Sequence, residues 1–132
     1  MAGREESKIV QVFSGSVPCR LPKWQELRNS LAHWLHDDRI PEEARAAVVL
    51  ATHEAAVNAI EHGRCEEIHV EARIEEDLIH LEVRADGAWK PPEPGNDERG
   101  RGMILMHRLM DSVTVDKGDH GTAVRMHRRL RG

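Results

Sequence analysis

The order of hydrophobic patterns predicts an α+β fold, a two-layer sandwich with three helices on one face of a mainly antiparallel (mixed) sheet. Two pairs of strand-like segments are each joined by a short turn, at 66–86 and 113–130, which indicates hairpins. Three other segments have helical spacing, and no strand–helix–strand alternation runs through the chain. With 132 residues, the sequence predicts one domain over residues 1–132, with a short disordered N-terminus at 1–6.

The first half predicts one strand and two helices. "KIVQVF" at 8–13 is rich in β-branched residues, and "SGSVPCRLP" should end that strand with its Gly and two Pro. Helical spacing from 23 to 37 rests on five apolar residues: Trp24, Leu27, Leu31, Trp34 and Leu35. A second helix is expected from Pro41, which suits a first helical turn, to His62, with Gly63 as its stop.

The second half predicts two hairpins separated by a long loop and a helix. "GAWKPPEPGNDERGRG" at 87–102 holds three Pro and four Gly, and is long for a connector. Loops of this kind in compact domains are often functional lids. "MILMHRLMDSV" at 103–113 returns to helical spacing, and the last hairpin should turn at "KGDHG".

Composition excludes several classes of protein. The formal net charge of −4 and the pI near 6.1 argue against direct nucleic-acid binding, which needs a basic surface. No apolar run approaches the roughly 18 residues that cross a bilayer, and "MAGREESK" lacks a signal-peptide core. Cys19 and Cys65 show no metal-binding spacing, so we expect two separate thiols in a reducing cytoplasm.

The segment "HEAAVNAIEHG" at 53–63 carries the candidate chemistry. Glu54, Asn58 and Glu61 lie within roughly 60° of one another on a helix. Ala47 and Ala51 share this side and should leave room for a ligand. The opposite side is expected to face the sheet and consists of Val49, Ala56 and Ile60, with Leu50 and Val57 between. A solvated charged helix face is the alternative, and His53 is expected on the core side.

Three glycine motifs follow this helix, at 86–87, 100–102 and 121–122. "GRG" directly before a helix would offer free N–H groups to a phosphate. Each motif alone is explained by a turn or a cap. Their order after an E-x-x-x-N-A-x-x-H helix is more specific.

These motifs resemble those of the GHKL ATP-binding superfamily over about residues 8–130. The sequence is most similar to the stand-alone bacterial anti-sigma-factor serine/threonine kinases of the actinobacterial branch. "EAAVNAIEHG" matches the N-box, and "VRADGAWKPP" stands in the place of the G1-box. "GRGMILMHRLMD" matches the G2-box, and "GTAVRM" the G3-box.

The resemblance implies ATP and Mg²⁺ as cofactors. Asn58 would ligate Mg²⁺, and Glu54 would be the general base on the attacking hydroxyl. The remaining nucleotide contacts would come from the three glycine boxes: Asp86, Gly87, Gly100, Arg101, Gly102, Met103, Gly121 and Thr122.

The G1-box departs from the family pattern, in which an Asp accepts a hydrogen bond from the adenine amino group. Aligning on Gly87 puts Ala85 in that slot, and Asp86 stands one residue late. A one-residue step along a strand turns a side chain to the other face. Either a bulge lets Asp86 do this work, or adenine recognition is weakened.

The resemblance therefore implies an anti-sigma-factor kinase that binds a sigma factor and phosphorylates an anti-anti-sigma (STAS-type) protein. The alternative is a non-catalytic anti-sigma or regulatory module with weak or no nucleotide binding, which Ala85 favours. A homodimer is expected through the edge strand at "KIVQVF". We expect no direct contact with nucleic acid or membrane.

Overall fold

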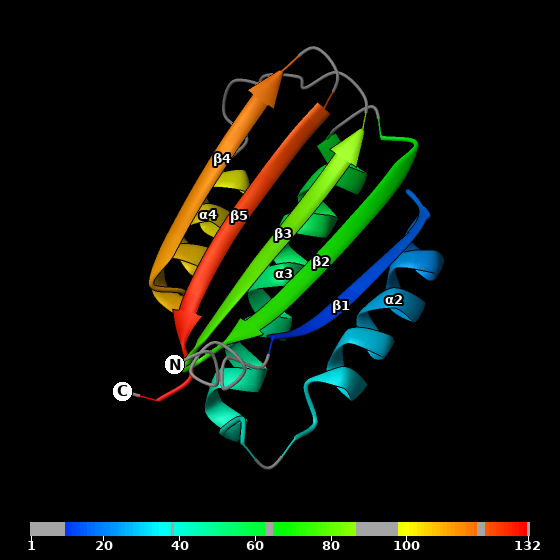
Figure 1. The fold of residues 1–132 in the computed structure, drawn as a ribbon. Helices are drawn as coiled ribbons and strands as arrows, with labels where there is room; N and C mark the ends of the chain where they lie inside the picture. The colour runs from blue at the N-terminus through cyan, green and yellow to red at the C-terminus, as the bar shows by residue number, and fades with distance from the viewer. Residues whose placement is uncertain (1–9, 38, 63–64, 87–97, 119–120, 132) are drawn as a thin grey trace.

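The computed structural model describes residues 10–37, 39–62, 65–86, 98–118 and 121–131 (Figure 1). Within them the chain forms one open sheet of order β1-β2-β3-β5-β4, with every neighbouring pair antiparallel. The helices lie on one side of this sheet, so the predicted two-layer α+β fold is confirmed. The elements in chain order are β1 Val10–Pro18, α2 Leu21–Trp34, α3 Glu42–His62, β2 Glu67–Glu75, β3 Leu78–Asp86, α4 Glu98–Leu109, β4 Ser112–Gly118 and β5 Gly121–Arg129.

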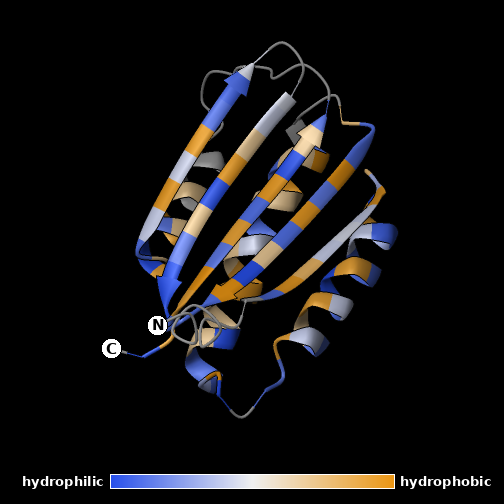
Figure 2. Ribbon diagram, in the orientation of Figure 1, coloured by the Kyte–Doolittle hydropathy of each residue, from blue (hydrophilic) through white to orange (hydrophobic). Residues whose placement is uncertain are grey.

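The core lies between the sheet and the helices. Alternate residues of the central strands are buried there, which Figure 2 shows as repeating hydrophobic bands. These are Ile68, Val70 and Ala72 on β2, Ile79, Leu81, Val83 and Ala85 on β3, and Val124 and Met126 on β5. Trp24, Leu31 and Leu35 meet them from α2 and the residue that follows it. Most of the alternating residues on the other face are polar or charged, because helices cover one face only.

Strand β1 is longer than predicted and continues through "SGSVP" to Pro18. Gly15 does not break it, because α2 approaches closely there. A Cβ added at Gly15 would lie 2.6 Å from Leu27 Cδ1. Pro18 is tolerated because β1 is an edge strand and needs no hydrogen bond on its outer side.

Helix α4 begins earlier than predicted, at Glu98 rather than at Met103. Gly100 and Gly102 therefore lie in its first turns, and the expectation that "GRG" precedes the helix is wrong. The first four N–H groups of any α-helix lack an intrahelical partner, so Gly100 still presents a free donor, whereas the N–H of Gly102 reaches the carbonyl of Glu98.

The two cysteines are paired, which corrects the expectation of separate thiols. Cys19 and Cys65 form a disulfide with their Cα atoms 5.7 Å apart. They are 46 residues apart in sequence, but Cys19 follows β1 and Cys65 precedes its neighbour β2. The argument from unpaired thiols to a reducing compartment therefore no longer supports a cytoplasmic location. Among the described helices, none has the length and apolarity needed to cross a membrane.

Candidate functional site

One end of the sheet gathers the segments that carry the sequence motifs. The C-terminal end of α3, the end of β3, the start of α4 and the start of β5 all lie there, at the top of Figure 1. The antiparallel connections bring these segments together, although they are spread over 60 residues of sequence. This end of the helix layer is the candidate functional site.

The predicted stripe on α3 changes its burial along the helix. Ala47 and Ala51 are buried, at 6% and 0% exposure, whereas Glu54 and Asn58 are half-buried. The two alanines therefore pack in the core and leave no space beside themselves. Leu50, which was expected between the two sides of the helix, is 40% exposed. Along the side that bears this stripe, the helix passes from buried alanines in its first half to half-buried carboxylate and amide side chains in its second half.

His53 fixes how α3 sits against α2. The Nε1 of the fully buried Trp24 donates to Nδ1 of His53 at 3.0 Å, and Arg28 Nη1 lies 3.3 Å from the same atom. Burial lowers the pKa of His53, and the positive charge of Arg28 lowers it further. A neutral imidazole accepts the Trp24 hydrogen bond, so His53 is the satisfied core-side residue that was expected.

The end of β3 resolves the choice between a bulge and a regular strand. Ala85 pairs with Ile68 on one side and with Thr122 on the other, in an unbroken register. Ala85 is 9% exposed on the helix side. Asp86 therefore stands on the other face, where its Oδ1 accepts hydrogen bonds from the N–H groups of Glu66 and Glu67 at 3.2 and 2.6 Å. No bulge turns Asp86 toward the helices.

Gly121 begins β5 tightly against the end of β3. Its φ is +149°, and an added Cβ would lie 2.4 Å from the carbonyl oxygen of Ala85. Only glycine fits this position without moving the backbone of β3. Thr122 follows opposite Ala85 and is half-buried. The third glycine motif therefore lies directly beside the strand end that carries the departure in the G1-box.

Other predicted site residues are placed in part. Met103 is half-buried and packs against the core from α4. The backbones of Gly100, Arg101 and Gly102 belong to α4. Gly87 and the proposed lid through residue 97 lie outside the described residues.

Residues 17–128 match the histidine kinase-like ATPase domain family, which is most of the chain. The chain belongs to this family. As a histidine kinase-like ATPase domain, it shares its fold with several solved structures.

The RsbU and RsbW domains of Rv1364c from Mycobacterium tuberculosis superpose with a TM-score of 0.74 at 20% identity, over 91% of this chain and 32% of that chain. The histidine kinase domain of the Erythrobacter litoralis EL346 blue-light activated histidine kinase gives 0.58 at 17% identity, over 86% and 62%. The Acinetobacter baumannii histidine kinase AdeS gives 0.55 at 8% identity, over 92% and 70%. The chain thus spans about a third of the Rv1364c chain, and these similarities show the fold.

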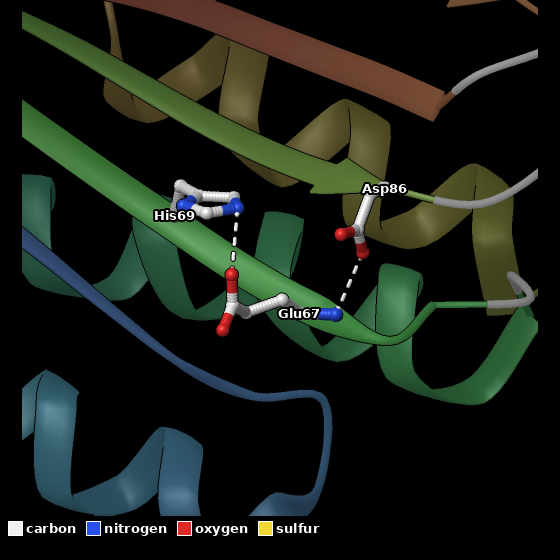
Figure 3. Close-up of side chains that lie close together, drawn as sticks. All are labelled: Glu67, His69 and Asp86. Atoms are coloured by element: carbon white, nitrogen blue, oxygen red, sulfur yellow. Dashed lines mark hydrogen bonds and ion pairs between the residues drawn. The ribbon is translucent and has the colours of Figure 1, made fainter.

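Two features of this end of the ATPase domain do not follow from the sequence patterns. One is the disulfide, and the other is a cluster of Glu67, His69 and Asp86 on the open face of the sheet (Figure 3). The strand alternation already places Glu67 and His69 on one face. The register of β2 with β3, which the sequence does not state, brings Asp86 to them.

Proposed function

We propose that this protein is an ATP- and Mg²⁺-dependent anti-sigma-factor serine/threonine kinase. It would bind a sigma factor and phosphorylate an anti-anti-sigma protein of the STAS type. The observation that carries this proposal is the half-open second half of α3. There Glu54 and Asn58 lie at the end of the helix layer shared with the start of α4 and with Gly121.

The donor set fits a magnesium nucleotide. Asn58 offers a hard oxygen ligand of the kind that Mg²⁺ prefers. The first turn of α4, with Gly100, offers backbone N–H groups and a positive dipole end to phosphates, and Gly102 follows in the next turn. Mg²⁺ supplies charge compensation to the triphosphate when it is bound. Arg101, Met103, Gly121 and Thr122 complete the proposed nucleotide contacts, together with Gly87. The carboxylate of Asp86, which the sequence motif put among them, lies on the other face of the sheet and is left out of the proposal.

Glu54 has the proposed role of general base. Phosphoryl transfer to a hydroxyl needs a carboxylate that accepts the hydroxyl proton while the nucleotide is held in line. The carboxylate of Glu54 stands one helical turn before Asn58 and is half-buried. The Trp24–His53 hydrogen bond holds the adjoining residue and so limits the rotation of this part of α3.

A non-catalytic regulatory module is the second candidate, and the end of β3 favours it. The helix side presents the methyl group of Ala85 where the family has a carboxylate for the adenine amino group. The carboxylate of Asp86 is engaged by two backbone N–H groups on the other face. Nucleotide binding would then depend on contacts to the phosphates rather than to the adenine.

A homodimer is part of the proposal. Among the described strands, β1 is an edge strand with Val12 54% exposed, and an edge of this kind is a template for pairing. Light scattering at micromolar concentration would give twice the 15.0 kDa chain mass. A mass near that of one chain contradicts the dimer and leaves the kinase proposal intact.

The decisive experiment is calorimetric titration with Mg-ATP, followed by transfer of labelled phosphate to a STAS-type protein. Asn58→Asp should weaken nucleotide binding, because it changes the Mg²⁺ ligand. Glu54→Ala and Glu54→Gln should keep binding and lose transfer. Glu43→Gln, an exposed change in the first turn of the same helix, is the matched control and should alter neither.

Each result separates the two candidates. Binding without transfer in the unchanged protein supports the non-catalytic module. Absence of both heat and thermal stabilisation at millimolar Mg-ATP refutes nucleotide binding altogether, because a ligand of the native state must raise stability. Equal loss of binding in the Asn58 and Glu54 variants contradicts the assigned roles.

A further inference from the structure

The open face of the sheet carries a cluster of three metal-ligating side chains that the proposed kinase chemistry does not use. Glu67 and His69 belong to β2, and Asp86 ends the neighbouring strand β3 (Figure 3). Alternation along β2 puts the first two on one face, since Ile68 between them is fully buried on the other. This face is opposite the helix layer that holds Glu54 and Asn58.

The donor atoms of the cluster converge. One ligand atom from each residue lies within 4.8 Å of the other two. His69 Nε2 is 3.2 Å from Glu67 Oε1. Zn²⁺ holds nitrogen and oxygen ligands at about 2.0–2.2 Å, so two ligands of one ion lie at most roughly 4.4 Å apart. Small side-chain rotations that move these atoms by a few tenths of an ångström would bring all three pairs within roughly 4.4 Å.

Asp86 is already oriented for such a role. Two backbone N–H groups, those of Glu66 and Glu67, donate to its Oδ1. Both bonds use the same oxygen, so within the described residues they orient the carboxylate through Oδ1. Supporting hydrogen bonds of this kind are typical of carboxylates that bind metals. The disulfide at Cys65 restrains the segment that provides these donors.

Arg84, the cationic residue paired with His69 across the two strands, does not neutralise the cluster by itself. Arg84 stands opposite His69, but its Nε lies 3.4 Å from Glu82 Oε1, in the next row of the sheet. The ion pair of His69 with Glu67 involves two of the three side chains. The carboxylate of Asp86 is then a second negative group beside Glu67, and a divalent ion between them would offset the charge of both.

We propose that Glu67, His69 and Asp86 form a binding site for a first-row divalent transition metal, with Zn²⁺ as the reference ion. One imidazole and two carboxylates suit Zn²⁺, Co²⁺ or Mn²⁺ better than Mg²⁺, which takes oxygen ligands only. Water would fill the remaining positions, because all three side chains are half-exposed. The ion would join the ends of β2 and β3 next to the motif end of the sheet, and is separate from the magnesium of the nucleotide.

The test is a Zn²⁺ titration of the full chain, prepared without a histidine tag and without nucleotide. We expect saturable binding of one ion per chain. His69→Gln and Glu67→Gln should each weaken binding at least about tenfold. Asp86→Asn keeps an oxygen for the Glu66 and Glu67 donors and should weaken it similarly. The visible absorption of bound Co²⁺, which depends on its ligands, should show the same losses in these variants.

Two matched controls share the open face but stand outside the cluster. His80→Gln and Glu71→Gln change the same residue types on β3 and β2 and should leave Zn²⁺ affinity within about twofold. The proposal is overturned by absence of saturable binding in the unchanged protein. It is equally overturned if the control variants lose as much affinity as the cluster variants, or if His69→Gln and Glu67→Gln both retain it. Because nucleotide is absent throughout, failure of the kinase proposal does not affect this result.

Discussion

The two faces of β3 differ in the burial and the charge of the side chains they carry. Toward the helices the strand presents Leu81, Val83 and Ala85, with at most 9% exposure. Toward the open face it presents Glu82 and Arg84, whose ion pairs continue across the sheet to Arg125. One face is held by burial of apolar surface, and the other by solvated charge pairs that contribute little each.

The difference shows why a single step along the strand matters at its end. Ala85 and Asp86 are neighbours in sequence, but one meets the helix layer and the other meets the backbone of β2. A carboxylate at position 85 would face the proposed nucleotide site, whereas a carboxylate at position 86 faces the proposed metal cluster. In this chain the carboxylate is on the open face.

The largest expected effect comes from breaking the covered face. Leu81 is 2% exposed, and Leu81→Ala should lower the free energy of unfolding by about 2–5 kcal/mol through lost burial and a cavity. Glu82→Gln, the adjacent change on the open face, should cost about 1 kcal/mol or less. Urea denaturation of both variants measures the contrast. Equal losses would mean that the open face is covered in solution.

Removing the disulfide tests whether the hydrogen bonds from the Glu66 and Glu67 N–H groups to Asp86 depend on a covalent restraint. Replacing both Cys19 and Cys65 by Ser should cost about 2–4 kcal/mol, since the bond closes a loop with a separation of 46 residues. Hydrogen exchange at the amides of Glu66 and Glu67 should accelerate more than exchange at Val83, far from the bond. Unchanged stability together with unchanged exchange would show that the cysteines are not paired in solution.

Moving the carboxylate to the helix side sharpens the comparison. Ala85→Asp should cost about 1–3 kcal/mol without ligand, because a buried polar group lacks a partner there. It should also tighten ATP binding about tenfold, since it supplies a charged acceptor for the adenine amino group. Titration with ATP and with GTP checks this, because GTP lacks that amino group. If Asp86→Asn instead weakens ATP binding, Asp86 contacts the base from its own position.

The smallest effect concerns acid stability, to which histidines on both sides of the sheet contribute. Burial lowers the pKa of His53 in the helix layer and that of His80 on the open face. The unfolded chain then binds more protons below its value of 6.5, so these groups destabilise the fold as the pH drops through and below 6.5. The melting temperature should fall over this range, and less steeply in His53→Gln. His107→Gln, an exposed change on α4, should leave the slope as it is.

Much of this architecture follows from local patterns. Alternation over 66–86 fixes both β2 and β3 and the face that each residue takes, because a strand has a period of two. Pro41 and the helical spacing after it give the start of α3 to within one residue. The stripe of Glu54 and Asn58 and the order of the glycine motifs are enough to indicate the family, since these residue types at these spacings have few other uses.

The tertiary structure decided what depends on neighbours distant in sequence. The packing of Leu27 against Gly15 let β1 run through a stretch rich in turn residues. The register of β2 with its two neighbours paired Cys19 with Cys65 and set Asp86 beside Glu67 and His69. Pairing with strands on both sides also kept Ala85 in a regular strand, which local sequence could not distinguish from a bulge. Within a regular strand, local sequence determines which face a side chain takes. Only the pairing of strands determines whether the strand stays regular and what the side chain meets there.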